Sequence, residues 1–295
     1  MVQTASGGHV RTQEQGRERR REQGRQQGRE WGRVAAKRPV LELREDPTGR
    51  SLGLELPPGA LVDLTVDGRW PEPLLWCAEG RLTGQPWHRA GLYPVLLDRG
   101  RSHEWEGTDG AGMRDGRWAW ELMPGACGDP AAFDAEQVLA GWWEEYACAD
   151  DGPWPGPAPA RTGEDPERVA GEVTAELIGH GVLTAPRTAL VPVARGADVL
   201  AAIGWTGPVN YDNDMAPYSA VLRSWEERFG IRVLGLGRGK LHLSVAAPPR
   251  TAEEALRVAI EHFAFCPDIV WQGTGGLVHR AQTLVNSPYW SFWWD

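Results

Sequence analysis

The most constraining feature of this sequence is the aromatic cluster in its last seven residues, 289–295. This run reads Tyr-Trp-Ser-Phe-Trp-Trp-Asp and contains five aromatic side chains. Each large aromatic side chain removes roughly 150–250 Å² from water when it is buried. Chain ends usually fray, so a terminus with this much apolar area needs to be covered by folding. We therefore predict that this run forms a core strand that closes a C-terminal domain.

The composition indicates a soluble globular protein. The chain has 295 residues, of which 41% are hydrophobic and 24% charged, and this length allows two domains with their own cores. Its four cysteines form no C-x-x-C pair, so neither a zinc knuckle nor a disulfide framework is predicted. No stretch approaches the 18 consecutive apolar residues of a membrane span, and the N-terminus lacks the apolar segment of a signal peptide. We expect a cytoplasmic protein without a membrane span.

Charge is distributed unevenly along the chain. Residues 1–38 carry ten Arg or Lys and four Glu, a net charge of +6, which leaves 21 basic and 36 acidic residues in the remainder. The first segment has almost no apolar residues, so we predict a disordered basic tail, either solvated or weakly bound to RNA or anionic lipid. The strongly acidic remainder disfavours nucleic-acid binding and favours a basic protein partner.

Short strand-like runs predict a mainly β domain over residues 39–149. Gly, Pro and Asp bound these runs, which lie at residues 61–66, 73–76, 91–97 and 117–122. Apolar residues at helical spacing then predict a helix over 130–146, capped by Asp129 or Asp134. The proline-dense segment 150–165 is typical of a semi-rigid linker, and we place the domain boundary there.

The remaining residues, 166–295, predict an α+β domain. A capping box, Thr-Ala-Glu-Glu at 251–254, starts a helix that extends to about residue 265. Other helices are predicted at residues 166–179, 196–203 and 216–229, and strands at 189–193, 231–236, 240–245 and 289–295. We expect a mixed or antiparallel sheet with packed helices.

Four motifs in this half resemble a known bacterial family. They are Ser-Trp-Glu-Glu-Arg-Phe-Gly at 224–230, the hairpin at 235–246, His-Phe-Ala-Phe-Cys-Pro-Asp at 262–268 and the closing Trp-Ser-Phe-Trp-Trp-Asp at 290–295. Together they resemble the domain of unknown function 4253, over roughly residues 186–295. The resemblance implies a domain identity, and it assigns neither an activity nor a cofactor.

The strongest candidates for chemistry are His262, Cys266 and Asp268. A histidine and a cysteine four residues apart share a helix face, and a thiolate beside an imidazole is a workable nucleophile. Pro267 places Cys266 at the end of the helix, where the helix dipole raises the pKa of a thiol and favours an imidazolium. We therefore favour a structural role for the three residues. A metal site that adds His242 matches no familiar ligand spacing, so we predict no metal and no cofactor.

The candidates for binding are Trp271, Asp212 and Asp214. The two aspartates lie in the acidic loop 210–214, which lacks the glycine and glutamate of an EF-hand, so we favour helix capping by Asp214. Tryptophan is enriched at binding hot spots, and several tryptophans of this chain lie among turn residues. They are Trp70, Trp87, Trp105, Trp154 and Trp271.

Two functions from different classes follow from these candidates. The leading prediction is a non-enzymatic protein-binding module, of the immunity-like or regulatory kind, that binds a basic protein. The alternative is a small-molecule enzyme, a hydrolase or a thiol-dependent activity, that uses His262, Cys266 and Asp268. A solvent-connected pocket at these three side chains would favour the enzyme, and an acidic surface with exposed tryptophan would favour the binding module.

Overall fold

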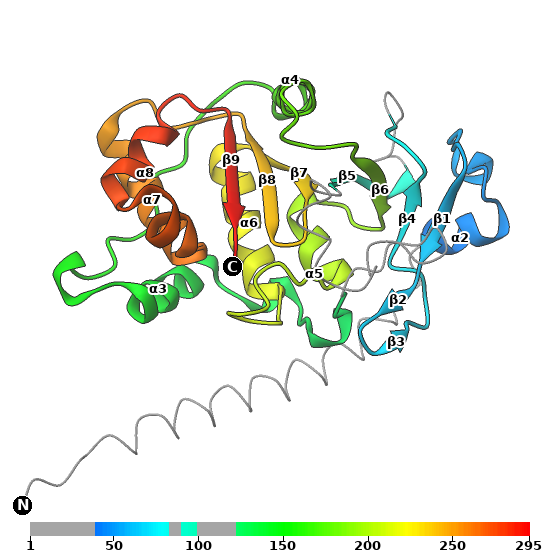
Figure 1. Ribbon diagram of the computed structural model, residues 1–295, viewed down its shortest axis with the longest axis horizontal. Helices are drawn as coiled ribbons and strands as arrows, with labels where there is room; N and C mark the ends of the chain where they lie inside the picture. The colour runs from blue at the N-terminus through cyan, green and yellow to red at the C-terminus, as the bar shows by residue number, and fades with distance from the viewer. Residues whose placement is uncertain (1–38, 83–89, 99–121) are drawn as a thin grey trace, which may run out of the picture.

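The structure is a computed structural model that describes residues 39–82, 90–98 and 122–295. The predicted tail at 1–38 and nearly all of the predicted strand at 117–122 lie outside the described residues, as do Trp87 and Trp105. Within the described ranges, one large sheet with helices on both faces organises the chain (Figure 1).

The sheet has seven strands in the order β1-β4-β6-β5-β7-β8-β9. Strand β5 pairs parallel with β7, and every other pairing in this sheet is antiparallel, so the sheet is mixed, which is one of the two alternatives that the sequence left open. A two-stranded ribbon of β2 and β3 is separate from it. The strands are β1 (Gly59–Val62), β2 (Leu64–Thr65), β3 (Gly68–Arg69), β4 (Leu75–Ala78), β5 (Tyr93–Leu97), β6 (Arg187–Val191), β7 (Ile231–Leu236), β8 (Lys240–Val245) and β9 (Tyr289–Trp293).

The position of β5 joins the two halves of the chain. This strand comes from the region 39–149, yet it lies between β6 and β7, which come from the region 166–295. Strands β1 and β4 extend the same sheet beyond β6. The separate, mainly β domain predicted for residues 39–149 is therefore not confirmed, because its strands of four or five residues belong to the common sheet.

Helices cover both faces of this sheet. Helix α2 packs with Trp76 and Leu190, and α4 packs with Leu96 and Leu234 on the same face. Helices α5, α6 and α7 cover the other face, and α3 and α8 pack against them. Strand β1 and α2 lie at one end of the sheet, and β9 lies at the other end near α7 and α8 (Figure 1). The α-helices are α2 (Pro39–Glu45), α3 (Ala135–Tyr146), α4 (Pro166–Gly179), α5 (Val199–Ile203), α6 (Ala216–Phe229), α7 (Ala252–Phe265) and α8 (Leu277–Leu284).

Short helical turns complete the described elements. Five are 3-10 helices, and one, η9, is a π-helix. They are η2 (Arg50–Leu52), η5 (Pro124–Ala126), η6 (Pro130–Ala132), η7 (Ala149–Asp151), η8 (Gly196–Asp198) and η9 (Ile269–Thr274).

Local capping explains where the main helices begin and end. The predicted helix over 130–146 is divided into η6 and α3, because Asp129 caps the first and Asp134 caps the second. Thr251 and Glu254 form the predicted capping box of α7. Gly230 ends α6 in the left-handed conformation, with φ of 62°, which glycine adopts without strain.

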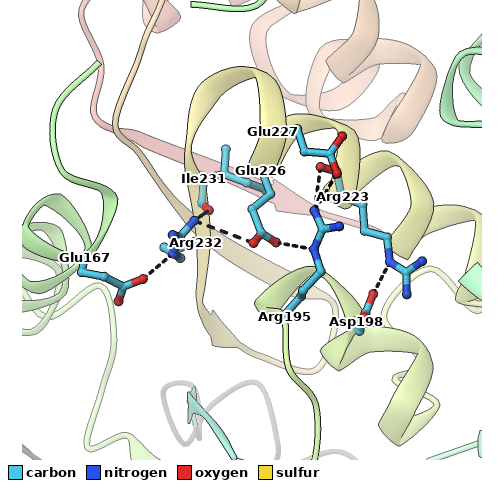
Figure 2. A network of polar contacts seen from close by, with 8 residues as sticks. All are labelled: Glu167, Arg195, Asp198, Arg223, Glu226, Glu227, Ile231 and Arg232. Carbon is cyan, nitrogen blue, oxygen red and sulfur yellow. Dashed lines mark hydrogen bonds and ion pairs between the residues drawn. The ribbon is translucent and has the colours of Figure 1, made fainter. Parts of the chain in front are cut away.

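A network of ion pairs joins the two helical layers at the start of β7 (Figure 2). Arg232 of β7 pairs with Glu167 of α4 at 2.6 Å, and it also lies 3.9 Å from Glu226 of α6. Glu226 pairs in turn with Arg195, which also reaches Glu227 at 3.0 Å. Since each of the two cations is paired with a carboxylate at a partly exposed position, this network supports the packing of α4 and α6.

The aromatic run at 289–295 forms strand β9 at one edge of the sheet. Its buried side chains point into the core between α6 and α7, where Trp290 and Phe292 are 1% exposed and Trp294 is 7% exposed. The ring of Phe292 stacks on that of Trp225, with 5.5 Å between their centroids. The prediction that this run is interior packing is therefore confirmed for the inward-facing half of its side chains.

The proline-dense segment 150–165, predicted to be a linker, packs against the helices. Ala158 is 3% exposed, and its backbone N–H donates to Glu261 of α7 at 2.6 Å. Arg228 of α6 forms a double hydrogen bond to the same carboxylate and donates to the Ala158 carbonyl at 2.7 Å. Trp225 adds a fourth donor to Glu261 at 2.7 Å. This fully buried carboxylate therefore fixes α6, α7 and the proline-dense segment together.

We predict that Glu261→Ala lowers the free energy of unfolding by about 3–5 kcal/mol, because it leaves the largely buried Arg228 cation without its carboxylate. Urea denaturation of the full chain measures this loss. The matched control is Glu253→Ala on the exposed side of the same helix, which should cost less than about 1 kcal/mol. Equal losses for the two variants would contradict the role assigned to Glu261.

Candidate functional site

The predicted His262, Cys266 and Asp268 cluster lies in the interior at the end of α7. His262 and Cys266 are 0% exposed, and Asp268 is 3% exposed. The ring of His262 is surrounded by Trp225, Trp290 and Phe292, with centroid distances of 5.2, 4.5 and 4.8 Å. These side chains are therefore almost completely shielded from solvent.

His262 is a neutral core residue, not the charged helix-end partner predicted from the sequence. Its burial and the neighbouring Arg280 cation hold the pKa of the imidazole well below its usual value. Arg280 Nη2 lies 3.1 Å from His262 Nδ1, and a guanidinium can only donate, so Nδ1 accepts and the proton is on Nε2. The prediction failed because aromatic residues distant in sequence cover this end of the helix.

Cys266 and Arg280 donate to carbonyls at the outer edge of the sheet. The outward-facing carbonyls of β9 need donors, because this strand has a neighbour on one side only. Cys266 Sγ donates to the Trp293 carbonyl at 3.0 Å, and Arg280 Nη2 donates to the Ser291 carbonyl at 3.2 Å. Ser287 Oγ donates to the Tyr289 carbonyl at 2.8 Å. The cysteine is thus a buried hydrogen-bond donor at a strand edge.

The electrostatics at Cys266 disfavour a nucleophile. Burial raises the pKa of its thiol far above the usual value, so the thiol stays protonated at neutral pH. Burial also lowers the pKa of Arg280 to about 10, and this side chain remains a cation, 5.8 Å from the centre of the Phe292 ring. Sequence reasoning missed Arg280, since no local pattern distinguishes a buried arginine from the exposed ones.

Asp268 holds the last residue of the sequence in place. Its Oδ2 accepts the backbone N–H of Asp295 at 3.1 Å, and its Oδ1 accepts the Tyr211 hydroxyl at 2.7 Å. Asn210 donates to the Asp295 carbonyl at 2.7 Å from the same loop as Tyr211. The three residues of the predicted cluster are therefore brought together, but the bonds they make are structural ones.

Asp214 also makes structural contacts. Its Oδ1 accepts the backbone N–H of Ala216, the first residue of α6, at 2.8 Å, and that of Gly128 at 3.0 Å. Burial raises the pKa of this carboxyl, which the two N–H groups counteract. The aspartate thereby joins the start of α6 to the segment before α3, whereas the N-cap position of α6 is occupied by Met215 and not by the predicted Asp214.

An exposed aromatic group lies at the surface beside this loop. Trp271, on the π-helix η9, is 53% exposed, and its ring meets Tyr146 of α3 edge to face at 6.1 Å. Tyr146 meets Tyr211 in the same way at 5.8 Å. Among the predicted surface tryptophans that the structure describes, Trp70 and Trp154 are partly buried against the core instead.

Exposed acidic residues neighbour two of these aromatic residues in the sequence. Asp212 is exposed next to Tyr211, and Glu144 is exposed two residues before Tyr146. Residues 122–160 contain seven Asp or Glu and no Arg, Lys or His. We define the acidic aromatic surface by these three rings and by two exposed acidic residues that neighbour them in the sequence, which are Tyr146, Tyr211, Trp271, Glu144 and Asp212.

The described residues also show how the chain stands with respect to metal ligands and membrane-spanning helices. Within residues 39–82, 90–98 and 122–295, no three His, Cys, Asp or Glu side chains converge in a group that could hold a metal ion. None of the helices in these ranges has the length and apolar content to span a bilayer.

We predict that iodoacetamide modifies Cys266 on the order of 100-fold more slowly than Cys148 in the folded full-length protein. The reason is that the thiolate reacts, and burial both raises the thiol pKa of Cys266 and blocks access, whereas Cys148 is exposed. Mass spectrometry of peptides from a time course measures both rates. Labelling in urea should bring the two rates together, and equal rates in the folded protein would revive the enzyme hypothesis.

We predict that stability falls as pH decreases from 6.5 towards 5. Burial lowers the pKa of His242 to about 4 and holds the pKa of His262 well below its usual value, so the unfolded chain takes up protons at these sites before the folded protein does. Each site should contribute a loss of about 1.4 kcal/mol per pH unit below pH 6.5. Denaturation curves at several pH values measure the slope, which His262→Gln should reduce and the exposed control His279→Gln should not. A flat profile would contradict the neutral buried histidines.

The C-terminal region of the chain matches the model of a known protein family. The family model of a domain of unknown function (DUF4253) matches residues 187–295, which confirms the resemblance predicted from the sequence. No curated protein and no solved structure matches the chain. The matched region includes Trp271, Tyr211 and Asp212, whereas Tyr146 and Glu144 precede it.

Proposed function

We propose that this protein is a non-enzymatic protein-binding module, of the immunity-like or regulatory kind, which binds a basic protein through the acidic aromatic surface. The observation that carries this proposal is the half-exposed indole of Trp271, whose ring contacts Tyr146 at the end of an acidic helix. Exposed tryptophan is costly in water and is enriched where proteins bind one another.

The neighbours of Trp271 hold it in a defined position. Besides Tyr146, the buried Phe263 of α7 contacts the indole ring edge to face, with 5.5 Å between centroids. Gln272, the next residue, donates to Asp268 at 3.2 Å and thereby fixes η9. A side chain that is already ordered loses little entropy when a partner covers it, so these contacts support binding at this position.

The charges around Trp271 favour a cationic partner. The segments that form the surface contain Glu144, Asp212 and several further carboxylates, and no Arg or Lys occurs in residues 122–160 or 203–222. A basic partner would therefore be attracted on approach and would meet no cation within these segments. An anionic partner such as a nucleic acid would be repelled by the same charges.

The proposed compartment is the cytoplasm. All four cysteines, at positions 77, 127, 148 and 266, are free in the structure. Free thiols that serve as small apolar residues and hydrogen-bond donors fit a reducing environment, in which they are not drawn into disulfides.

The proposal is tested by finding the partner and measuring the binding with purified components. Affinity capture from the cells of origin, followed by mass spectrometry, supplies candidates, and the full chain is then titrated with each purified candidate. We expect Trp271→Ala to weaken binding by at least about 30-fold, which corresponds to the 2 kcal/mol of a binding hot spot. Asp212→Asn should chiefly slow association and reduce its dependence on salt.

Two substitutions elsewhere serve as matched controls. Val182→Ala removes an exposed apolar side chain just after α4, and Glu176→Gln removes an exposed charge on α4, on the opposite face of the sheet. Both should leave the affinity unchanged, and all variants should melt at the temperature of the unaltered protein to within a few degrees. A captured partner that binds Trp271→Ala as tightly as the unaltered chain would refute the proposed surface.

A further inference from the structure

We infer that Arg280 of α8 forms a binding site for a small carboxylate anion at the outer edge of β9. This site shares no residue with the acidic aromatic surface and does not rest on the proposed function. The inference depends on a buried cation that no carboxylate of the described residues balances, and on the N–H donors of its guanidinium that these residues leave free.

Arg280 is a buried cation whose contacts carry no negative charge. The residue is 9% exposed. Within the described part of the chain, its guanidinium contacts a neutral imidazole nitrogen of His262, the carbonyl of Ser291 and the ring of Phe292. A buried charge is costly unless an opposite charge compensates it, so this position favours an anion.

Other arginines of the described residues are paired with carboxylates. Three such pairs, with nitrogen–oxygen distances of 2.5, 2.5 and 2.6 Å, are Arg223–Asp198, Arg228–Glu261 and Arg232–Glu167. All three arginines are more exposed than Arg280. The fold thus supplies a carboxylate to arginines that are only partly buried, whereas the more deeply buried Arg280 has none among the described residues.

The guanidinium of Arg280 also has unused donors. Its Nη2 donates to His262 Nδ1 at 3.1 Å and to the Ser291 carbonyl at 3.2 Å, and these two bonds use both N–H groups of this nitrogen. Nε is buried and has no acceptor in the described part of the chain. An arginine has five N–H donors, so those of Nε and Nη1 remain for a ligand.

The edge of β9 places a backbone donor beside this guanidinium. Trp294 N–H donates to the Gly239 carbonyl at 3.0 Å, so the even-numbered residues of β9 turn their backbone groups towards β8. Ser291 therefore points both its carbonyl and its N–H away from the sheet. Since Arg280 binds that carbonyl, the neighbouring N–H lies on the same side and can donate to an anion held by Arg280.

The surroundings favour a monovalent anion. Ser291 is half-buried and His279, which precedes Arg280 on α8, is exposed, so the site lies close to the surface. The Phe292 ring, with its centre 5.8 Å from Arg280 Cζ, makes one side of the site apolar. One cation balances one negative charge, and a second negative charge would be costly beside this ring, so a carboxylate fits better than a phosphate dianion.

The test measures the melting temperature of the full chain at pH 7 in sodium acetate, sodium phosphate and sodium chloride of equal ionic strength. A ligand that binds only the folded protein raises the melting temperature. We expect acetate at about 50 mM to raise it by about 3 °C or more relative to chloride. The part of the shift that depends on Arg280 should be smaller in phosphate, and a larger one in phosphate would overturn the choice of a carboxylate.

Variants assign the shift to Arg280. Arg280→Met removes the cation and keeps an apolar stem, so it should abolish the difference between acetate and chloride. Arg280→Lys keeps the charge without the planar fork and should retain only part of the difference. The matched control, Arg257→Met, removes an exposed arginine from α7 and should leave the difference unchanged. A difference that survives Arg280→Met would overturn the inference.

NMR spectroscopy of the unaltered chain gives a result even where a variant fails to fold. On titration with acetate, the Nε–H resonance of Arg280 and the backbone N–H resonance of Ser291 should shift together and yield one dissociation constant. The backbone N–H resonance of Arg257 should stay in place. If the Arg280 and Ser291 resonances do not respond, or if acetate and chloride give the unaltered chain the same melting temperature, the carboxylate site is wrong.

Discussion

The buried carboxylate of Glu261 is the interaction on which the arrangement of this protein depends. It accepts hydrogen bonds from Arg228, Trp225 and the backbone of Ala158, and so it joins α6, α7 and the proline-dense segment 150–165. A charge at 0% exposure is tolerated only when such partners surround it. Helix α3 directly precedes segment 150–165, so fixing this segment holds α3 near α7. Tyr146 at the end of α3 then contacts the ring of Trp271. The surface proposed to bind a partner thus depends on a carboxylate in the core.

The edge of the sheet explains why histidine, cysteine and aspartate lie so close together in the sequence. An edge strand rich in aromatic residues would invite pairing with another chain if its outer carbonyls and N–H groups were left open. In this protein, side chains of Cys266, Arg280 and Ser287 donate to those carbonyls, while Asp268 accepts the N–H of Asp295. Cys266 and Asp268 lie close together in the sequence because both follow the end of α7, where they form hydrogen bonds to Trp293 and Asp295. Burial raises the pKa of the Cys266 thiol and lowers the pKa of the His262 imidazole. A thiol nucleophile requires a lowered pKa, and a general base requires a pKa near the working pH.

Local signals predicted local structure well. The bounds of α4, α6 and α7 and the β7–β8 hairpin follow from capping residues, apolar periodicity and a glycine-rich turn, all of which act within a few residues. The failures concern contacts between distant parts of the chain. Nothing in the sequence of β5 specifies that it lies between β6 and β7, since a short apolar strand pairs equally well with many neighbours. Glu261 and Arg280 were missed for the same reason, because a buried charge is recognisable only once its partners are known. Trp271 was predicted correctly as a surface candidate from its turn-rich surroundings, but its ring partners were not.

The family match and the structure divide the chain at different places, and this difference bears on function. Residues 187–295 match the family, yet the sheet of this region is continuous only when β5 from outside the match is included. The acidic aromatic surface has the same composite origin, with Trp271, Tyr211 and Asp212 inside the matched region and Tyr146 and Glu144 on α3 outside it. A surface built by both regions exists only where both are present, so the matched region alone does not carry the proposed binding function. The preceding region therefore completes the sheet through β5 and supplies Tyr146 to the aromatic contacts around Trp271.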